Sequence, residues 1–167
     1  MTVSVKKIAS IACLAFLAGG GSALWAADST RTVQVISEAG AQQVLAAAEH
    51  AAEKLHAPCA IAVVDGSGTL VAFLKMDDVR SGSPELAIGK ARTSALLERP
   101  SAETENNVDN GRAAFMSSGL MTLRGGEPLK AGGQVVGAVG VAGLNKDNDV
   151  AIAQAAAAAF ASTASAH

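Results

Sequence analysis

The distribution of glycine is the feature that most constrains the fold, because glycines gather in residues 125–143, which read GGEPLKAGGQVVGAVGVAG. Seven of the chain's seventeen glycines lie there, among them the pairs Gly125-Gly126 and Gly132-Gly133. Gly-Gly between apolar runs is typical of a two-residue hairpin turn, since glycine accepts a positive φ at both central positions. The stretch therefore predicts three antiparallel strands, at residues 120–124, 127–130 and 134–142.

The last of these strands has very small side chains on one face. Valines alternate there with glycine and alanine. Such a face lets a helix, another backbone or a flat ligand come close to the sheet. The segment predicts a surface built for close approach, and it leaves open which of the three occupies that surface.

Patterns in the rest of the chain place further elements around these strands. Ser37 before an apolar stripe at helical spacing predicts an N-cap and a helix, and Ser83 followed by Pro84 predicts the start of a second helix. A short glycine turn between two apolar runs predicts a hairpin. The expected elements are a helix at 38–55, strands at 59–65 and 69–75, a helix from 83 to 98, a loop or broken helix at 101–110, one or two helical turns at 111–118, and a last helix capped by Asp147 or Asn148 and ending at Phe160.

These elements predict a single domain of the α/β class at residues 33–160, with a central five-stranded antiparallel sheet and helices packed on it. Alternation of apolar and polar residues in the strands is imperfect, which indicates that both faces of the sheet are covered. Residues 161–167 are expected to fray as a tail.

The N-terminus has the layout of a secretory signal peptide, residues 1–26. Lys6 and Lys7 precede an apolar run that is too short to span a bilayer, and small residues follow it. We therefore expect a periplasmic or secreted protein, with no membrane attachment after cleavage. Removing two lysines and no acidic residue takes the formal charge from −2 to about −4. This acidic balance argues against nucleic-acid partners and anionic membrane surfaces.

A histidine and a cysteine stand close together where the first helix is expected to meet a strand. Imidazole and thiolate are both ligands of haem iron, so His56 and Cys59 are candidates for a metal contact. A structural zinc site would need four ligands, and the others are not evident. The ordinary alternative is that His56 favours the helix dipole and that Cys59 is a small core residue.

Cations around the expected second helix are candidates for binding a ligand's carboxylates: Arg80, Lys90 and Arg92. Surface charge beside neighbouring acids is the alternative for each. Gly125 and Gly126 would let a backbone amide approach the ligand. No strong catalytic motif, such as a nucleophile elbow, a phosphate-binding loop or a zinc-protease helix, is present.

Three successive runs, AIAVVDGSGTLVAFLKMDD, SPELAIGKARTSALLERPS and GGEPLKAGGQVVGAVGVAG, resemble the GlcG/HbpS family of haem-binding-protein-like domains. The chain is also similar to the PduO C-terminal domain. The resemblance covers about residues 33–160. It implies a profilin-like, three-layer α/β/α fold, homo-oligomers that are sometimes octamers, and, for some members, binding of haem or a related tetrapyrrole.

We therefore expect a secreted homo-oligomer that binds haem or another small ligand and acts as a carrier, scavenger or sensor. One alternative is a lyase, isomerase or hydrolase that works near Gly125 and Gly126 with Asp77, Lys90 or Glu127 as acid or base, since such catalysis needs only one or two positioned groups. The other alternative is a structural homo-oligomer without a ligand, whose apolar surface serves self-association.

Overall fold

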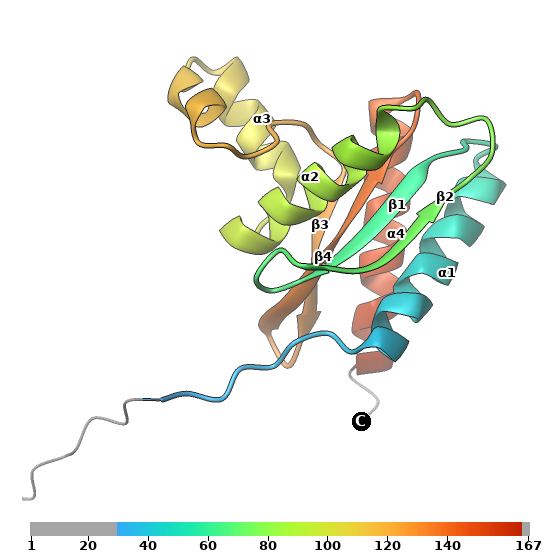
Figure 1. Cartoon of the computed structure of the whole chain (residues 1–167), viewed down its shortest axis with the longest axis vertical. Coiled ribbons are helices and arrows are strands. Elements are labelled where there is room, and N and C mark those ends of the chain that lie inside the picture. The colour runs from blue at the N-terminus through green and yellow to red at the C-terminus, as the bar shows by residue number, and fades with distance from the viewer. Residues whose placement is uncertain (1–29, 165–167) are drawn as a thin grey trace, which may run out of the picture. The chain divides into compact units, whose positions relative to one another are not determined.

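A computed structural model describes residues 30–164 of the chain (Figure 1). The chain divides into two units, residues 1–32 and 33–167. In the first unit only residues 30–32 are described, and they are exposed and without regular structure. The predicted signal peptide lies outside the described residues, as does His167.

Over residues 33–164, the second unit is a three-layer α/β/α arrangement of four α-helices and one antiparallel sheet. The strand order in the sheet is β2-β1-β4-β3. Helices α1 and α4 pack on one face and α2 packs on the other (Figure 1). The elements are α1 (Glu38–Lys54), β1 (Ala60–Asp65), β2 (Leu70–Lys75), α2 (Ser83–Leu97), α3 (Ser101–Asp109), the 3₁₀ helix η1 (Ala113–Ser117), β3 (Gly126–Ala131), β4 (Gln134–Ala142) and α4 (Lys146–Ala164).

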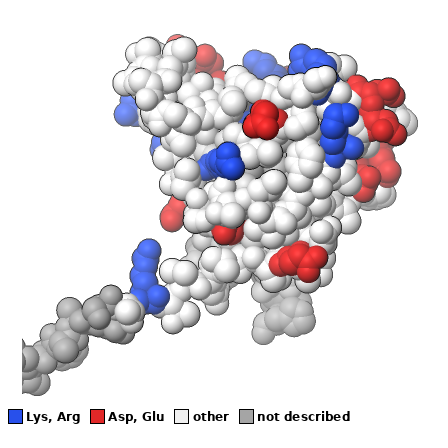
Figure 2. All heavy atoms as spheres, in the orientation of Figure 1, with Lys and Arg blue, Asp and Glu red and all other residues white. Residues whose placement is uncertain are grey.

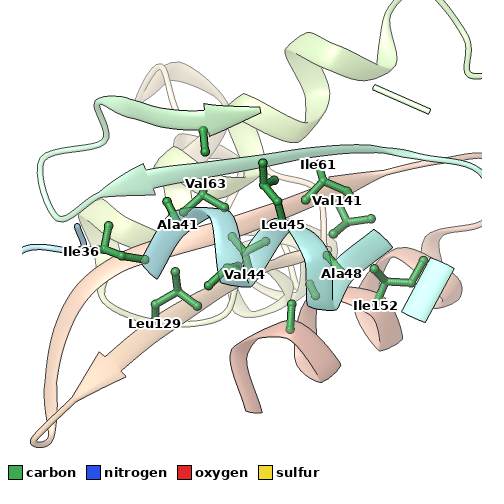
Figure 3. Packing of buried hydrophobic residues seen from close by; sticks show 14 of the residues in the cluster. Ile36, Ala41, Val44, Leu45, Ala48, Ile61, Val63, Leu129, Val141 and Ile152 are labelled. Carbon is green, nitrogen blue, oxygen red and sulfur yellow. The ribbon is translucent and has the colours of Figure 1, made fainter. Parts of the chain in front are cut away.

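Strand β1 lies between two apolar cores, one on each face of the sheet. Ile61 and Val63 point toward α1 and α4, where they meet Val44 and Leu45 of α1 (Figure 3). The alternate residues Ala60, Ala62 and Val64 point toward α2. Because both faces of this strand are buried, its sequence is apolar throughout, as the imperfect alternation predicted.

The small face of the sheet is occupied by the backbone of α2. A Cβ atom on Gly140 would lie 2.1 Å from the carbonyl oxygen of Ala87, and one on Gly126 would lie 2.2 Å from that of Lys90. Both distances are far shorter than real contacts allow, so only glycine permits this approach. Of the three occupants that the sequence left open, the helix is therefore the one present.

The sheet has four strands, and the predicted strand at residues 120–124 is wrong. Carbonyl groups of this segment accept hydrogen bonds from helix side chains and not from a neighbouring strand. The Thr93 hydroxyl donates to the Met121 carbonyl at 3.0 Å, and the Ser101 hydroxyl donates to the Leu123 carbonyl at 2.7 Å. Gly125 has a φ of +107° and leads directly into β3. This glycine pair serves close packing, whereas the second pair, between β3 and β4, forms the predicted turn.

Helix starts follow the expected chemistry in part. Ser37 is the N-cap of α1, and its hydroxyl accepts a backbone N–H from the first turn at 3.1 Å. Ser83 is not a cap: it is the first residue of α2, 1% exposed, and Gly82 precedes it without a capping side chain. Pro84 in the first turn marks this start correctly, since its missing N–H is not needed there.

The C-terminal half contains more helix than expected. Residues 101–109, predicted as a loop or broken helix, form the continuous helix α3. The cap of α4 is Asn145, whose side-chain oxygen accepts the backbone N–H groups of Asp147 and Asn148 at 2.8 and 3.2 Å. Residues 161–164, which we expected to fray, belong to α4.

Basic and acidic side chains both occur on the face drawn in Figure 2, with broad neutral areas between them. Within residues 30–164, no helix combines the length and the apolar character needed to cross a bilayer.

Candidate functional site

The two residues predicted to contact a metal have different surroundings. Cys59 is fully buried, and burial, followed by the nearby Asp149 carboxylate, raises the pKa of its thiol to about 12. A thiol that keeps its proton is a poor metal ligand, because the thiolate is the ligating form. His56 is exposed, just beyond the end of α1, with a φ of +48°. Among the described residues, no group of three or more His, Cys, Asp or Glu side chains is placed to hold a metal ion.

A shallow apolar groove runs between α1 and α4, and we call it the α1–α4 groove. On α1 its residues follow one helical stripe, and on α4 they recur every fourth residue. Its volume is about 390 Å³. The lining residues are Ala47, His50, Ala51, Lys54, Leu55, Ala151, Ala155 and Ala159.

The chemistry of this groove is a flat alanine floor with two polar side chains from α1. The His50 side chain is 67% exposed, and its Nδ1 lies 3.9 Å from an oxygen of Glu53. The ammonium of Lys54 stands one turn further along the helix. Imidazole is the commonest protein ligand for metals, and an ammonium pairs with carboxylates. The groove therefore offers an apolar surface, a nitrogen ligand and a cation together.

A second cavity, which we call the basic pocket, lies between α2, the segment before β3 and the start of α4. Its volume is about 150 Å³. Four basic and two acidic residues line it, together with apolar walls. The charged residues are Arg80, Lys90, Arg124, Lys146, Glu105 and Asp149, and the walls include Leu86, Leu123, Ala142 and Leu144.

Lys90 forms a buried ion pair in the basic pocket. Its Nζ donates to Asp149 Oδ2 and to the Val141 carbonyl, each at 2.8 Å. The other Asp149 oxygen accepts the backbone N–H of Gly143 at 2.7 Å. The backbone of α2 packs directly on glycines of the sheet. Lys90 therefore lies close enough to the sheet for its side chain to reach the end of β4.

The three cations predicted to meet carboxylates fall into two groups. Arg80 lines the basic pocket with Lys90, and one of its terminal nitrogens donates to the Gly143 carbonyl at 2.9 Å. Arg92 lies elsewhere: its Nε donates to the Gly68 carbonyl at 3.1 Å, at the turn between β1 and β2. The structure thus brings Arg80 and Lys90 together in the basic pocket and places Arg92 outside it.

Gly125 and Gly126 adjoin the same ion pair. A Cβ on Gly125 would lie 3.2 Å from Lys90 Nζ and 2.9 Å from the Val141 carbonyl oxygen. The Gly126 amide donates to the Ser101 hydroxyl at 2.9 Å. Both residues are buried, so they shape the surroundings of Lys90 and expose no amide to a ligand.

The acid and base candidates of the enzyme alternative lie in different places. Lys90 is in the basic pocket, whereas Asp77 lines a different surface cavity beside Lys75 and Met76. Glu127, on β3, is 9% exposed; burial raises the pKa of its carboxyl, partly offset by a hydrogen bond from Gln154. Neither of these two cavities is lined by more than one of the three residues.

Sequence reasoning missed several residues of both cavities. His50 is exposed on α1, and α4 lies close enough beside it to make this side of α1 one wall of a groove. Asp149 lies 59 positions from Lys90 in the chain. A pattern read along one helix carries no signal for a pairing across that separation.

Comparison with known proteins matches nearly the whole second unit to one protein family. Residues 36–158 match the family model HbpS-like, described as haem degrading protein HbpS-like. The protein GlcG of Escherichia coli K12 is 40% identical over 112 residues, which are 66% of this chain and 84% of GlcG.

Two solved structures share the fold. A double mutant of HbpS from Streptomyces reticuli superimposes with a TM-score of 0.72 at 25% identity, over 93% of this chain and 97% of that one. The complex of PduOC with haem gives a TM-score of 0.68 at 29% identity, over 75% of this chain and 94% of that one. The resemblance inferred from the sequence motifs is therefore confirmed.

Proposed function

Because this chain belongs to the HbpS-like family, we propose that it binds haem or a related tetrapyrrole in the α1–α4 groove. The observation that carries the proposal is the joint presence there of an apolar floor and an accessible imidazole. The haem complex of the related PduOC supports a tetrapyrrole as the ligand class.

The residues of the groove fit the chemical needs of haem. A planar macrocycle needs a flat apolar surface, and alanine side chains from two helices provide one without projecting into it. His50 presents a ring nitrogen that can bind iron, and Lys54 presents an ammonium that can pair with a propionate. When bound, the iron would supply the redox or sensing chemistry, and the chain would hold and orient the macrocycle.

This assignment differs from the sequence expectation in its iron contact. Cys59 is buried and protonated, so the groove histidine replaces it as the candidate. His56 is a second exposed imidazole near the same helix end, and it does not line the α1–α4 groove. The two histidines therefore make two distinct hypotheses that one experiment separates.

The test is a titration of the protein with haemin, followed by the Soret absorbance band. We expect the natural chain to give a saturable, shifted band, and His50→Ala to lose the shift. His56→Ala is the matched control and should behave like the natural chain. The proposal for the groove is wrong if His56→Ala loses the shifted band and His50→Ala retains it.

A second pair of variants tests the groove itself without touching a histidine. Ala155→Met fills the floor and should weaken haemin binding at least about tenfold, since a larger side chain excludes the macrocycle. Ala158→Met adds the same group at an exposed position of α4 outside the groove and should bind haemin normally. Equal binding by both variants would place the ligand elsewhere.

We further propose that the chain is exported and acts as a homo-oligomeric carrier, scavenger or sensor of its ligand. The layout of residues 1–26 supports export, and the mass of the protein recovered from the periplasm tests it. Native mass measurement gives the oligomer number, for which an octamer is one expectation. A Soret band that stays constant for hours supports carriage, and a steady loss of the band under a reductant supports degradation.

A further inference from the structure

The basic pocket is too small for a tetrapyrrole, although four basic residues surround it. Its volume is about 150 Å³. A cavity of that size holds a molecule about as large as benzene, with about six heavy atoms. Whatever it accommodates is therefore a compact molecule, distinct from the ligand of the α1–α4 groove.

Among the residues that line the pocket, basic side chains outnumber acidic ones by two. Asp149 is paired with Lys90, and Glu105 is paired with Arg124. Arg80 and Lys146 have no acidic partner among the residues that line the pocket. The whole chain has a formal charge of −2, whereas the residues that line the pocket have two more basic than acidic side chains. This difference favours the binding of an anion in the pocket.

Donors as well as charge are available to such an anion. Of the three N–H groups of the Lys90 ammonium, two are used, by Val141 and Asp149. Arg80 uses one terminal nitrogen on the Gly143 carbonyl and keeps further guanidinium N–H groups. The pocket also lies at the N-terminal end of α4, whose dipole favours negative charge.

The apolar walls of the pocket favour an anion with a carbon body over an inorganic anion. Leu86, Leu123, Leu144 and Ala142 line the pocket between the charged groups. Leu144 is 73% exposed and Leu123 is 39% exposed, so both are free to cover a small apolar body. A planar carboxylate also matches the two parallel donors of a guanidinium.

We propose that the basic pocket binds a small organic carboxylate of about six heavy atoms. Its carboxylate lies between Arg80 and Lys146, its carbon body lies against the leucine walls, and a hydroxyl or carbonyl oxygen accepts from Lys90. This site is independent of the α1–α4 groove, and it holds whether or not the chain binds haem.

The experiment is calorimetric titration of the full chain with lactate, a hydroxy acid of about the required size. Lactamide has nearly the same shape without the charge. We expect lactate to bind and lactamide not to bind, because the carboxylate supplies the charge-assisted hydrogen bonds. Equal binding of the two, binding of neither, or displacement of lactate by equimolar inorganic phosphate would overturn the proposal.

Two charge-neutralising variants locate the site. Arg80 and Lys146 are exposed, so Arg80→Gln combined with Lys146→Gln should fold normally and weaken lactate binding at least about tenfold, as the loss of charge-assisted hydrogen bonds predicts. Lys130→Gln removes an exposed cation outside the pocket and should leave lactate affinity within about twofold. Unchanged affinity in the double variant would contradict the assignment.

The same variants separate this site from the haem proposal. The double variant should give the natural Soret shift with haemin, and His50→Ala should bind lactate normally. Loss of haemin binding in the double variant would mean that the pocket holds a propionate of haem, and the independent carboxylate site would then be rejected.

Discussion

Lys90 Nζ lies 2.8 Å from Asp149 Oδ2, and this contact joins helices on opposite faces of the sheet. Their side chains are only 5% and 6% exposed. Lys90 also donates to the Val141 carbonyl near the end of β4, and Asp149 accepts from Gly143 just beyond that strand. The pair therefore ties α2, α4 and the end of β4 to one another.

Breaking this pair from one side should be costly. Lys90→Met leaves the Asp149 carboxylate buried without its partner, and we expect a loss of about 3–5 kcal/mol in the free energy of unfolding. Adding Asp149→Asn removes the buried charge while keeping an acceptor for Gly143, so the double variant should be more stable than Lys90→Met alone. Urea unfolding of the natural chain, the two single variants and the double variant measures the coupling between the two sites.

A surface pair provides the control. Arg99 Nη1 lies 3.8 Å from Glu103 Oε2, with side chains 35% and 53% exposed. Glu103→Gln should change the free energy of unfolding by less than about 1 kcal/mol, since solvent screens such pairs. Simple additivity of Lys90→Met and Asp149→Asn would show that the buried pair is no more coupled than a surface one.

The contact between α2 and the sheet makes a separate prediction. Gly140→Ala would place a methyl group 2.1 Å from the Ala87 carbonyl oxygen, so the helix must move away from the sheet. We expect a loss of about 3 kcal/mol or more, measured by urea unfolding, because overpacking of a rigid core is costly.

The matched glycine for this test is Gly82. It has an ordinary φ of −83°, and a Cβ added there would have no atom within 4 Å. Gly82→Ala should therefore keep or slightly raise the free energy of unfolding, since alanine restricts the unfolded chain. A similar loss in both variants would mean that close packing is not the reason for Gly140.

The sequence predicted most elements because their signals are local. The cap at Ser37 and the glycine turn between β3 and β4 act within a few residues. The pair Gly125-Gly126 misled the strand prediction, since glycine serves both tight turns and close packing and only the packed helix decides which. The extra strand followed from that ambiguity.

The candidate sites were less predictable than the fold. The sequence predicted Arg80, Lys90 and Arg92 as ligand-binding cations because of their charge. Only the packing of α2 on the sheet places Arg80 and Lys90 in the basic pocket and Arg92 at the turn between β1 and β2. The groove beside His50 exists only because α4 packs next to α1. Sites made by two elements far apart in the chain leave no pattern in either one.

Glu127 gives a prediction about pH. Burial raises the pKa of its carboxyl above the ordinary value of 4.5, partly offset by the Gln154 hydrogen bond. Its contribution to stability is therefore fully present below the unfolded pKa and declines as pH rises through the folded pKa. Glu127→Gln should raise the melting temperature at pH 7, and the gain should shrink toward about pH 4.

An exposed carboxylate controls for general charge effects. The Glu53 side chain is 61% exposed, so Glu53→Gln should shift the melting temperature little at either pH. A gain for Glu127→Gln that is the same at pH 7 and about pH 4 would show that packing, and not ionisation, is responsible.

Cys59 should be unreactive in the folded protein. Burial raises the pKa of its thiol to about 12 and leaves it no exposed surface, so the thiol keeps its proton at pH 8 and the reactive thiolate is scarce. The chain's other cysteine, Cys13, lies in the predicted signal peptide and is replaced by serine so that only Cys59 can react. In this Cys13→Ser background, iodoacetamide should leave the folded protein unlabelled for hours and label it within minutes in denaturant. Rapid labelling of the folded protein would mean that the thiol reaches solvent, and Cys59 would then return as a candidate ligand.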